Sequence, residues 1–501
     1  MFNLLIGTPG ASCLEPAPGR PCAVGALLPR LLNSLLIAIS LLCTVPLMAA
    51  EGSGDKRPNI VYVMVDDQRF DQLSYMGHPY LNTPNIDRLA AEGARFSRAY
   101  VNTPLCGPSR GSLFTGRLAG MHRIVNHVVW PGRYPKGDFM PGVMKEAGYA
   151  TAIIGKWGMG TRGDPRPEFD KWFVDEGLQY PDSLQDRVTQ RRERREYYDE
   201  HLYQDQRYRD GPEMVTIEGY LTDILFDEAI EFCARDADEP FIAMITPHTP
   251  HSPYNPAARH KGLFNGKGLM DAKTRDLEKG FEQYPNLGRN ERLLRQYESQ
   301  CEMMLSIDEG VGRLYAALEQ AGKLDNTIFI YTSDNGFMWG EHGHFHKAKP
   351  WEESVKVPLV IRYPAWFKPG TEIDELITLT DFSATFVAIA GGPELKDAYG
   401  VDMVPFFTNK VDKIRDEVVT LMYDQEAEQP MTPVWSGVIE KRYKYTAYSD
   451  GTESLMFDLQ EDPHEEVNLA NDPAMADKRV QMVARLKEVL SENGTPADWV
   501  K

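Results

Sequence analysis

Cysteine is scarce in this sequence, and the few cysteines are unevenly placed. Six occur in 501 residues, and three of them fall within the first fifty: Cys13, Cys22 and Cys43. So few cysteines exclude a disulfide-stapled scaffold. Cys233 and Cys301 lie in helical patterns, which predicts that they are buried or paired with each other. Cys106 lies instead in the Gly- and Pro-containing segment AYVNTPLCGPSRGSLFTGR, residues 99–117, and needs a separate explanation.

The sequence also lacks an excess of positive charge. It contains 54 Lys and Arg against 73 Asp and Glu, so the formal net charge is −19. Such an acidic surface argues against nucleic acid as a partner. An anionic substrate must then be held by a local cluster of cations or by a metal ion.

Long apolar runs are absent except near the start of the chain. After Arg30, the segment LLNSLLIAISLLCTVPLMAA is uncharged and apolar and ends in small residues. This pattern is typical of a secretory signal. We therefore expect residues 1–50 to be a leader, and the protein to be periplasmic or secreted. The alternative is an uncleaved leader that anchors the chain; otherwise no stable membrane partner is expected.

Short runs rich in Val and Ile alternate with helical patterns along the rest of the chain. This alternation predicts an α/β fold with a large mixed, mostly parallel sheet sandwiched by helices. The strands that we expect are residues 59–65, 150–155, 240–246, 327–333 and 357–363. The helices that we expect are residues 85–94, the segment after Cys106, 140–148, 222–234, 292–322 and 381–391.

The pattern changes after about residue 405. Short strand signals and one final helical pattern follow, at residues 418–424, 436–448, 455–459 and 477–490. They predict a smaller C-terminal α+β subdomain. We therefore divide the chain into a leader over 1–50, an α/β catalytic domain over 51–405 and an α+β subdomain over 406–501.

Arginine is concentrated in the segment DRVTQRRERREYYDEHLYQDQRYRD, residues 186–210. A basic surface that binds glycans would be one interpretation. Acidic residues are interspersed with the arginines, however, so we favour a solvated, salt-bridged helix or insertion.

Two polar pairs come directly after predicted strands. Asp66 and Asp67 follow the first strand, and Asp334 and Asn335 follow the fourth. Ligands of open parallel sheets collect at the carboxyl ends of strands, so both pairs should face one crevice. Either pair alone is explained by turn capping. Together they offer hard oxygen donors for Ca²⁺ or Mg²⁺ and no soft ligand for zinc or copper.

Cys106 has the sequence context of a helix start. A Gly-Pro pair follows it, which makes Cys106 a candidate N-cap, and Thr115-Gly116 resembles a helix end. A side chain at a helix N-terminus faces unpaired N–H groups, which suits a nucleophile that attacks an anion. Arg110 is expected on the same helical face, within reach of position 106 and the anion. The alternative is a buried free thiol followed by an ordinary helix.

The segment CGPSRGSLFTGR, residues 106–117, resembles the signature of the type I sulfatases, a family with an alkaline-phosphatase-like fold. In that family a separate formylglycine-generating enzyme oxidises the cysteine to formylglycine, an aldehyde whose hydrate is the nucleophile. The resemblance implies that Cys106 is a precursor. PNIVYVMVDD and SDNG resemble the family's metal-binding segments. By resemblance, the ligands of a Ca²⁺ ion, with Mg²⁺ as the alternative, are Asp66, Asp67, Cys106, Asp334 and Asn335.

Two further segments resemble the parts of the family that contact sulfate. GKWGMG implies Lys156 as a sulfate contact, although Gly158 stands where the family has histidine. GEHGHFHKAKPWEESVKVPLVIR implies a sulfate-binding Lys347, which the spacing to the following tryptophan selects over Lys349. Whether another histidine replaces the missing one stays open, and the candidates are His122, His342, His344 and His346.

A Pro-His-x-Pro pattern occurs twice in TPHTPHSPYNP, residues 246–256. By resemblance His251 is the catalytic, substrate-contacting histidine, and His248 is a second substrate contact. A lone histidine near a strand end is usually structural, but two in one Pro-rich loop favour a function. DLQEDPHEEVNLA, residues 458–470, is similar to the family's C-terminal signature.

These residues predict hydrolysis of a sulfate ester on a sulfated carbohydrate or another organic sulfate. The metal ion would hold the sulfate oxygens together with Lys156, Lys347 and Arg110. The hydrated aldehyde at position 106 would attack sulfur, and His251 would protonate the leaving alcohol. One alternative is a phosphoester or phosphonate monoester hydrolase of the same superfamily. The other is a non-catalytic anion-binding relative, which the glycine at position 158 favours.

Overall fold

The computed structural model describes residues 57–125, 138–159, 165–177, 181–184, 190–268, 291–423, 434–452 and 454–500. The expected leader, residues 1–50, lies outside these ranges. Within them, none of the helices combines the length and the apolar character that a membrane span requires.

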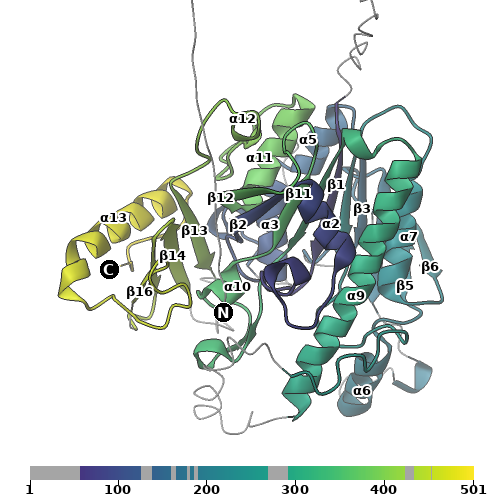
Figure 1. Ribbon diagram of the computed structural model, residues 1–501, viewed down its shortest axis with the longest axis horizontal. Coiled ribbons are helices and arrows are strands. Elements are labelled where there is room, and N and C mark those ends of the chain that lie inside the picture. Colours follow the sequence, from purple (N-terminus) through teal and green to yellow (C-terminus); the bar gives the residue numbers. More distant parts are fainter. Residues whose placement is uncertain are drawn as a thin grey trace, which may run out of the picture. The chain divides into compact units, whose positions relative to one another are not determined.

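A ten-stranded sheet forms the centre of the described chain (Figure 1). Its strands lie in the order β12-β2-β11-β8-β1-β7-β3-β4-β5-β6. The four central strands are mutually parallel: β8 (Thr327–Ser333), β1 (Asn59–Val65), β7 (Phe241–Thr246) and β3 (Ala150–Gly155). The outer strands are β12 (Thr371–Thr378), β2 (Ala94–Tyr100), β11 (Leu359–Arg362), β4 (Lys171–Gly177), β5 (Arg207–Asp210) and β6 (Glu213–Thr216). Because β11, β5 and β6 run antiparallel to their neighbours, the sheet is mixed.

The side chains of β1 alternate between two cores, one on each face of the sheet. Val61, Val63 and Val65 pack with three helices, α2 (Pro84–Glu92), α7 (Leu221–Ala234) and α9 (Glu291–Gln320). Ile60, Tyr62 and Met64 pack with α3 (Cys106–Thr115), α5 (Met140–Glu146) and α11 (Leu379–Ala390). A strand with both faces covered needs a continuous apolar sequence, which explains the run NIVYVMV.

A second, smaller sheet lies in the C-terminal part of the chain. It is antiparallel, in the order β13 (Glu417–Met422), β14 (Trp435–Glu440), β15 (Tyr443–Tyr448) and β16 (Leu455–Asp458). Helix α13 (Ala476–Glu492) packs against it through Leu486 and Leu490. The expected α/β class with a smaller C-terminal sheet is therefore confirmed. The short remaining elements are α4 (Ala119–His122), α6 (Arg191–His201), α10 (Glu352–Val355), α12 (Val404–Phe407), β9 (Met338–Trp339) and β10 (Phe345–His346).

Several peripheral elements differ from the expectation. Strands β2, β4, β5, β6 and β12 were not predicted, because charged residues interrupt their apolar patterns, as in ARFSRAY and TEIDELIT. The arginine-rich segment contains α6, whose exposed arginines form (i, i+4) ion pairs such as Arg192–Glu196, as expected for a salt-bridged helix. The three cysteines outside the leader are all buried and free, so Cys233 and Cys301 are not paired with each other.

A buried ion pair connects the smaller sheet to the chain around α10. Lys444 on β15 is 1% exposed, and its Nζ lies 2.7 Å from Glu465 and 3.3 Å from Glu352, the first residue of α10. The backbone N–H of Glu352 also donates a hydrogen bond to Glu465. Glu465 therefore depends on Lys444 for its counter-charge, whereas Glu352 also lies 3.5 Å from Lys356 Nζ.

Replacing Lys444 with methionine should lower the free energy of unfolding by about 3–5 kcal/mol, because the buried Glu465 would lose its cation and Glu352 would keep only the more distant Lys356. Urea-induced unfolding measures this loss. Lys441→Met is the matched control, since Lys441 is 45% exposed and pairs with Glu375 near the surface. Its loss should stay below about 1 kcal/mol. Equal losses in the two variants would contradict the structural role of Lys444.

Candidate active site

The register of β1 against β8 brings the two predicted polar pairs together. Val65 lies opposite Ser333, so the residues that follow each strand leave the sheet at one edge. The backbone N–H of Asp67 donates to Asp334 (3.4 Å), and Asn335 Nδ2 donates to Asp67 Oδ1 (2.7 Å). Asp66 joins them from the end of β1, and all four side chains are buried.

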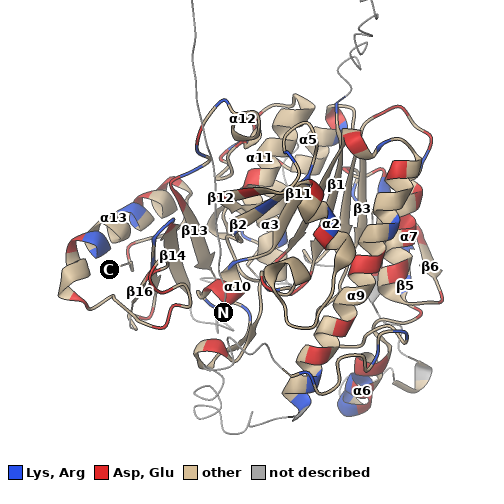
Figure 2. Cartoon of the chain, in the orientation of Figure 1, with Lys and Arg blue, Asp and Glu red and all other residues tan. Residues whose placement is uncertain are grey.

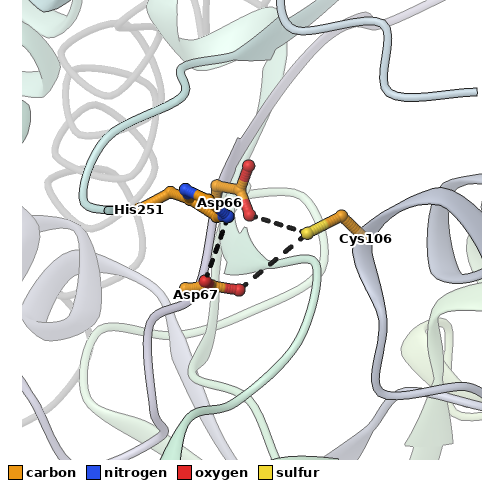
Figure 3. A group of neighbouring side chains, drawn as sticks. All are labelled: Asp66, Asp67, Cys106 and His251. Atoms are coloured by element: carbon orange, nitrogen blue, oxygen red, sulfur yellow. Dashed lines mark hydrogen bonds and ion pairs between the residues drawn. The ribbon is translucent and has the colours of Figure 1, made fainter. Parts of the chain in front are cut away.

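Cys106 faces this group from the start of α3 (Figure 3). Its Sγ lies 3.0 Å from Asp66 Oδ1, 3.9 Å from Asp67 Oδ1 and 2.7 Å from Lys347 Nζ. The thiol is completely buried, and burial, followed by the charges of Asp334 and Asp66, raises its pKa well above the ordinary value. An unmodified Cys106 would therefore stay protonated and unreactive at neutral pH.

The boundaries of α3 differ by one residue from the expectation. Leu105 is the N-cap, so Cys106 occupies the first helical position and is not itself the cap. The expectation that Cys106 is the N-cap is therefore wrong by one residue. Leu105 still has an extended backbone conformation, so the helix begins at Cys106. The expected helix end is confirmed, since Gly116 follows the last residue in a left-handed conformation with φ +70°.

Three cations, of which Arg110 is fully buried and two lysines are partly buried, balance the three carboxylates. Lys156 pairs with Asp66, and Lys347 pairs with Asp67. Arg110 is fully buried and contacts Asp334 through Nε at 3.0 Å and Nη2 at 2.8 Å. Its Nη1 donates a third bond, to the carbonyl oxygen of Lys156 (2.7 Å). Arg110 therefore contacts Asp334 and the backbone of Lys156, and its expected contact with position 106 and a bound anion stays a prediction.

The pKa values reflect a strongly charged, buried site. Burial opposes ionisation of Asp66, yet the charge of Lys156 holds its pKa well below the usual range. Asp67 behaves similarly, with burial outweighed by the charge of Lys347, and its pKa is also lowered. Burial and the nearby Asp66 raise the pKa of Asp334 to about 6 despite Arg110. A further positive charge at this place would therefore favour ionisation of all three carboxyl groups.

The side-chain chemistry fits a hard divalent cation. Asn335 Nδ2 donates to Asp67 Oδ1 and to the carbonyl oxygen of Gly336, which fixes the orientation of the amide. Its Oδ1 is buried and has no hydrogen-bond partner among the residues that the structure describes. An unpaired carbonyl oxygen beside three carboxylates is a suitable ligand set for Ca²⁺ or Mg²⁺. Asp66, Asp67, Cys106 and His251 also place possible ligand atoms within 4.8 Å of one another.

The two predicted histidines lie in the loop after β7, beside the acidic group. His251 Nε2 is 3.5 Å from Asp67 Oδ2, while its Nδ1 is 2.5 Å from the carbonyl oxygen of Ser252. A carbonyl oxygen only accepts, so Nδ1 carries the proton and Nε2 faces Asp67. Burial lowers the pKa of His251 to about 3, so this imidazole is neutral. His248 lies behind it, with Nε2 3.3 Å from His251 Nδ1.

Two residues that position this loop were not predicted. Tyr203 donates its hydroxyl to the carbonyl oxygen of His251 (2.5 Å) and lies within 3.3 Å of that of His248. Asp175, on β4, is 3.8 Å from His248 Nδ1. Recognising β4 as a strand would have placed Asp175 near this edge of the sheet, but Tyr203 follows α6 and gives no sequence signal.

Lack of space beside Arg110 explains why position 158 is occupied by glycine. Gly158 adopts a left-handed conformation with φ +72°, and a Cβ added there would lie 2.8 Å from Arg110 Cδ. A histidine side chain would therefore collide with Arg110. Among the described residues, Cys106 is contacted by Asp66, Asp67 and Lys347 and by none of the four candidate replacement histidines.

Comparison with known proteins identifies the family. The sulfatase family model matches residues 58–392, and the model of the N-sulphoglucosamine sulphohydrolase C-terminal region matches residues 340–492. The chain belongs to the sulfatase family. It is thus assigned to the sulfuric ester hydrolases, which favours the expected sulfatase over both alternatives. The expected resemblance is confirmed over most of the chain after the leader.

This sulfatase is similar to several characterised proteins. It is 28% identical to the N-acetylglucosamine-6-O-sulfatase of Bacteroides thetaiotaomicron, over 91% of this chain and 90% of that protein. A solved structure in complex with its substrate D-glucosamine-2-N,6-O-disulfate has a TM-score of 0.73 at 26% identity, covering 87% and 98% of the two chains. A phosphonate monoester hydrolase of Agrobacterium radiobacter has a TM-score of 0.67 at 23% identity, covering 87% and 96%, and shows the fold alone.

Gly158→His should reduce activity even though it introduces the residue that the family resemblance leads one to expect. The new side chain would displace Arg110 and strain the backbone, so we expect kcat/KM to fall at least about tenfold, or about 1.4 kcal/mol. Steady-state kinetics on a sulfate ester that the native enzyme hydrolyses measures the change. Gly211→Ala is the control, because Gly211 is also left-handed but has no atom within 4 Å of an added Cβ. A gain of activity in Gly158→His would refute the steric explanation.

Proposed function

We propose that this sulfatase hydrolyses a sulfate ester of a sulfated carbohydrate, with formylglycine at position 106 as nucleophile and a bound divalent cation, Ca²⁺ by family resemblance. The main support is the position of Cys106, buried at the start of α3 between two carboxylates and a lysine. The sugar is inferred from the relatives, one of which is an N-acetylglucosamine-6-O-sulfatase. A formylglycine-generating enzyme is the maturation partner that this proposal requires.

Formylglycine and the divalent cation would supply the attacking oxygen and part of the positive charge. A hydrated aldehyde offers an oxygen nucleophile and a second hydroxyl, and a divalent cation polarises sulfate oxygens and favours an ionised hydroxyl. Asp66, Asp67, Asp334 and Asn335 would hold the cation beside position 106. The helix N-terminus at residue 106 favours negative charge there.

Lys156, Lys347 and Arg110 are proposed to bind the sulfate oxygens. Burial opposes their charge, but Asp66 raises the pKa of Lys156, Asp67 that of Lys347, and Asp334 that of Arg110. They therefore stay protonated at any working pH. In the described site these three cations balance three carboxylates, so a divalent cation would give the site an excess of two positive charges. That excess would attract an anionic ester and stabilise charge that develops during sulfuryl transfer.

His251 is proposed to protonate the leaving alcohol. Because Nδ1–H already donates to Ser252, Nε2 has to take up a proton from solvent, to which the side chain is 24% exposed, before it can give one away. The Asp67 carboxylate, 3.5 Å from Nε2, favours that uptake. His248, one layer further from Cys106, is proposed to position His251 and to contact the rest of the substrate.

Two broader assignments are also proposed. The apolar segment after Arg30 would direct export, so the enzyme would meet its substrate in the periplasm or outside the cell. The catalytic domain would comprise residues 51–405 and the α+β subdomain residues 406–501. The buried contact of Lys444 with Glu352 would then be an interdomain contact.

The first test is the mass of the tryptic peptide Ala99–Arg110 from protein produced together with the maturing enzyme. We expect the mass of the aldehyde. Cys106→Ala should lower kcat by at least about 10³-fold, because it removes the nucleophile. Cys233→Ala, at a second buried free cysteine, should retain activity. An unmodified thiol in fully active enzyme would exclude the proposed nucleophile.

Removal of the divalent cation should abolish turnover. Dialysis against a chelator should give inactive protein, and titration with Ca²⁺ or Mg²⁺ should restore activity. Asn335→Ala should raise the cation concentration for half-maximal activity at least about tenfold, because it removes the unpaired carbonyl oxygen. Asn326→Ala is the control, since Asn326 precedes β8 and donates to Arg57. Full activity after chelation would contradict the proposed metal site.

A further inference from the structure

A second pocket lies next to the loop that carries His251. It has a volume of about 480 Å³ and is formed by α6, the loop after β7 and the beginning of α9. Ser252, Pro253 and Tyr254 line one side of it. Ser252 follows His251 in the chain, and its carbonyl oxygen accepts a hydrogen bond from His251 Nδ1. The candidate active site and this pocket therefore share a wall.

The pocket is positively charged in an otherwise acidic protein. Arg195, Arg292 and Arg295 line it together with a single acidic residue, Asp199. In Figure 2, blue Lys and Arg positions gather on α6 and at the start of α9. The lining thus has an excess of two positive charges, whereas the chain has a formal net charge of −19.

Within the described part of the chain, two of the three guanidinium groups have no carboxylate partner. Arg195 pairs with Asp199 at 2.9 Å. Arg295 has one contact, to Asn265 Oδ1 at the long distance of 3.5 Å, and Arg292 has no hydrogen-bond or ion-pair partner among the described residues. Guanidinium groups bind sulfate and carboxylate through paired N–H donors, so these two are available for an anionic ligand.

We propose that this arginine pocket, defined by Arg195, Arg292 and Arg295, binds a second anionic group of the substrate. The inference rests on the proposed function, because it assumes that the sulfate to be hydrolysed lies at Cys106. The second group is a sulfate or a carboxylate on the same sugar or on the next one. Ser252, Gln296 and Ser299 also line the pocket and provide donors and acceptors for sugar hydroxyls. The enzyme would thus select glycans that carry more than one negative charge.

This selectivity is testable with three matched probes. They are N-acetylglucosamine 6-sulfate, glucosamine N,6-disulfate and N-acetylglucosamine 6-sulfate linked to a uronic acid. We expect kcat/KM to be at least about tenfold higher for a doubly charged probe than for the first, mainly through a lower KM. A preference for both doubly charged probes would indicate that the pocket accepts either anion. A preference for one of them would identify the second group of that probe, sulfate or carboxylate, as the ligand.

The double variant Arg292→Ala/Arg295→Ala should remove the preference, so that the ratio of kcat/KM values falls to near one. Both arginines are exposed and neither pairs with a carboxylate of the described ranges, so the replacement leaves no buried group of these ranges unpaired. Arg192→Ala is the control, because Arg192 lies on α6, is 85% exposed and pairs with Glu196 outside the pocket. Its preference should equal that of the native enzyme.

Binding to the Cys106→Ala protein separates this inference from the proposed function. Calorimetric titration with the same probes needs no turnover, and the double variant should lose at least about tenfold in affinity for the doubly charged probes. Equal affinity of the native pocket for all three probes, or a preference that survives the double variant, would overturn the inference. Absence of turnover with intact selective binding would count against the proposed reaction and leave the pocket supported.

Discussion

The charge balance at the ends of β1 and β8 is the constraint on which the rest of the site depends. Three carboxylates and three cations are enclosed together, and neither set is stable in a buried place without the other. Arg110 illustrates this, since it is fully buried, contacts Asp334 and touches Lys156. The sheet brings the carboxylates together, and α3 and two loops bring the cations. Removal of any one of these charges therefore makes the ionised forms of its neighbours less stable.

The central part of the fold could be predicted because its sequence has little freedom. Strands that are buried on both faces must be continuously apolar, as β1 and β8 are, and the polar residues that follow them lie at one edge. Outer strands such as β2 and β12 are covered less completely and tolerate charged residues. Their sequences match no simple period, so only the pairing in the folded sheet reveals them.

The candidate site was predictable in its residue types but not in its contacts. The motifs identified the residues that gather around Cys106. They could not reveal that Arg110 occupies the space beside Gly158, because that depends on a left-handed backbone and on a side-chain position. The arginine pocket was equally hidden. The charge pattern of the segment around α6 predicts a salt-bridged helix, and this holds for both Arg192 and Arg195. That Arg195 also lies beside two arginines of α9 follows only from the folded chain.

The complete burial of Cys106 has a consequence for the order of events during biosynthesis. A modifying enzyme is itself a macromolecule and has to enclose the peptide that it oxidises. It cannot reach a thiol that is packed between Asp66 and Lys347 unless this part of the chain opens. The proposed oxidation of Cys106 would therefore have to precede folding of this part of the chain. A chain that folded first would stay immature, so the yield of active enzyme would depend on the relative rates of these two processes.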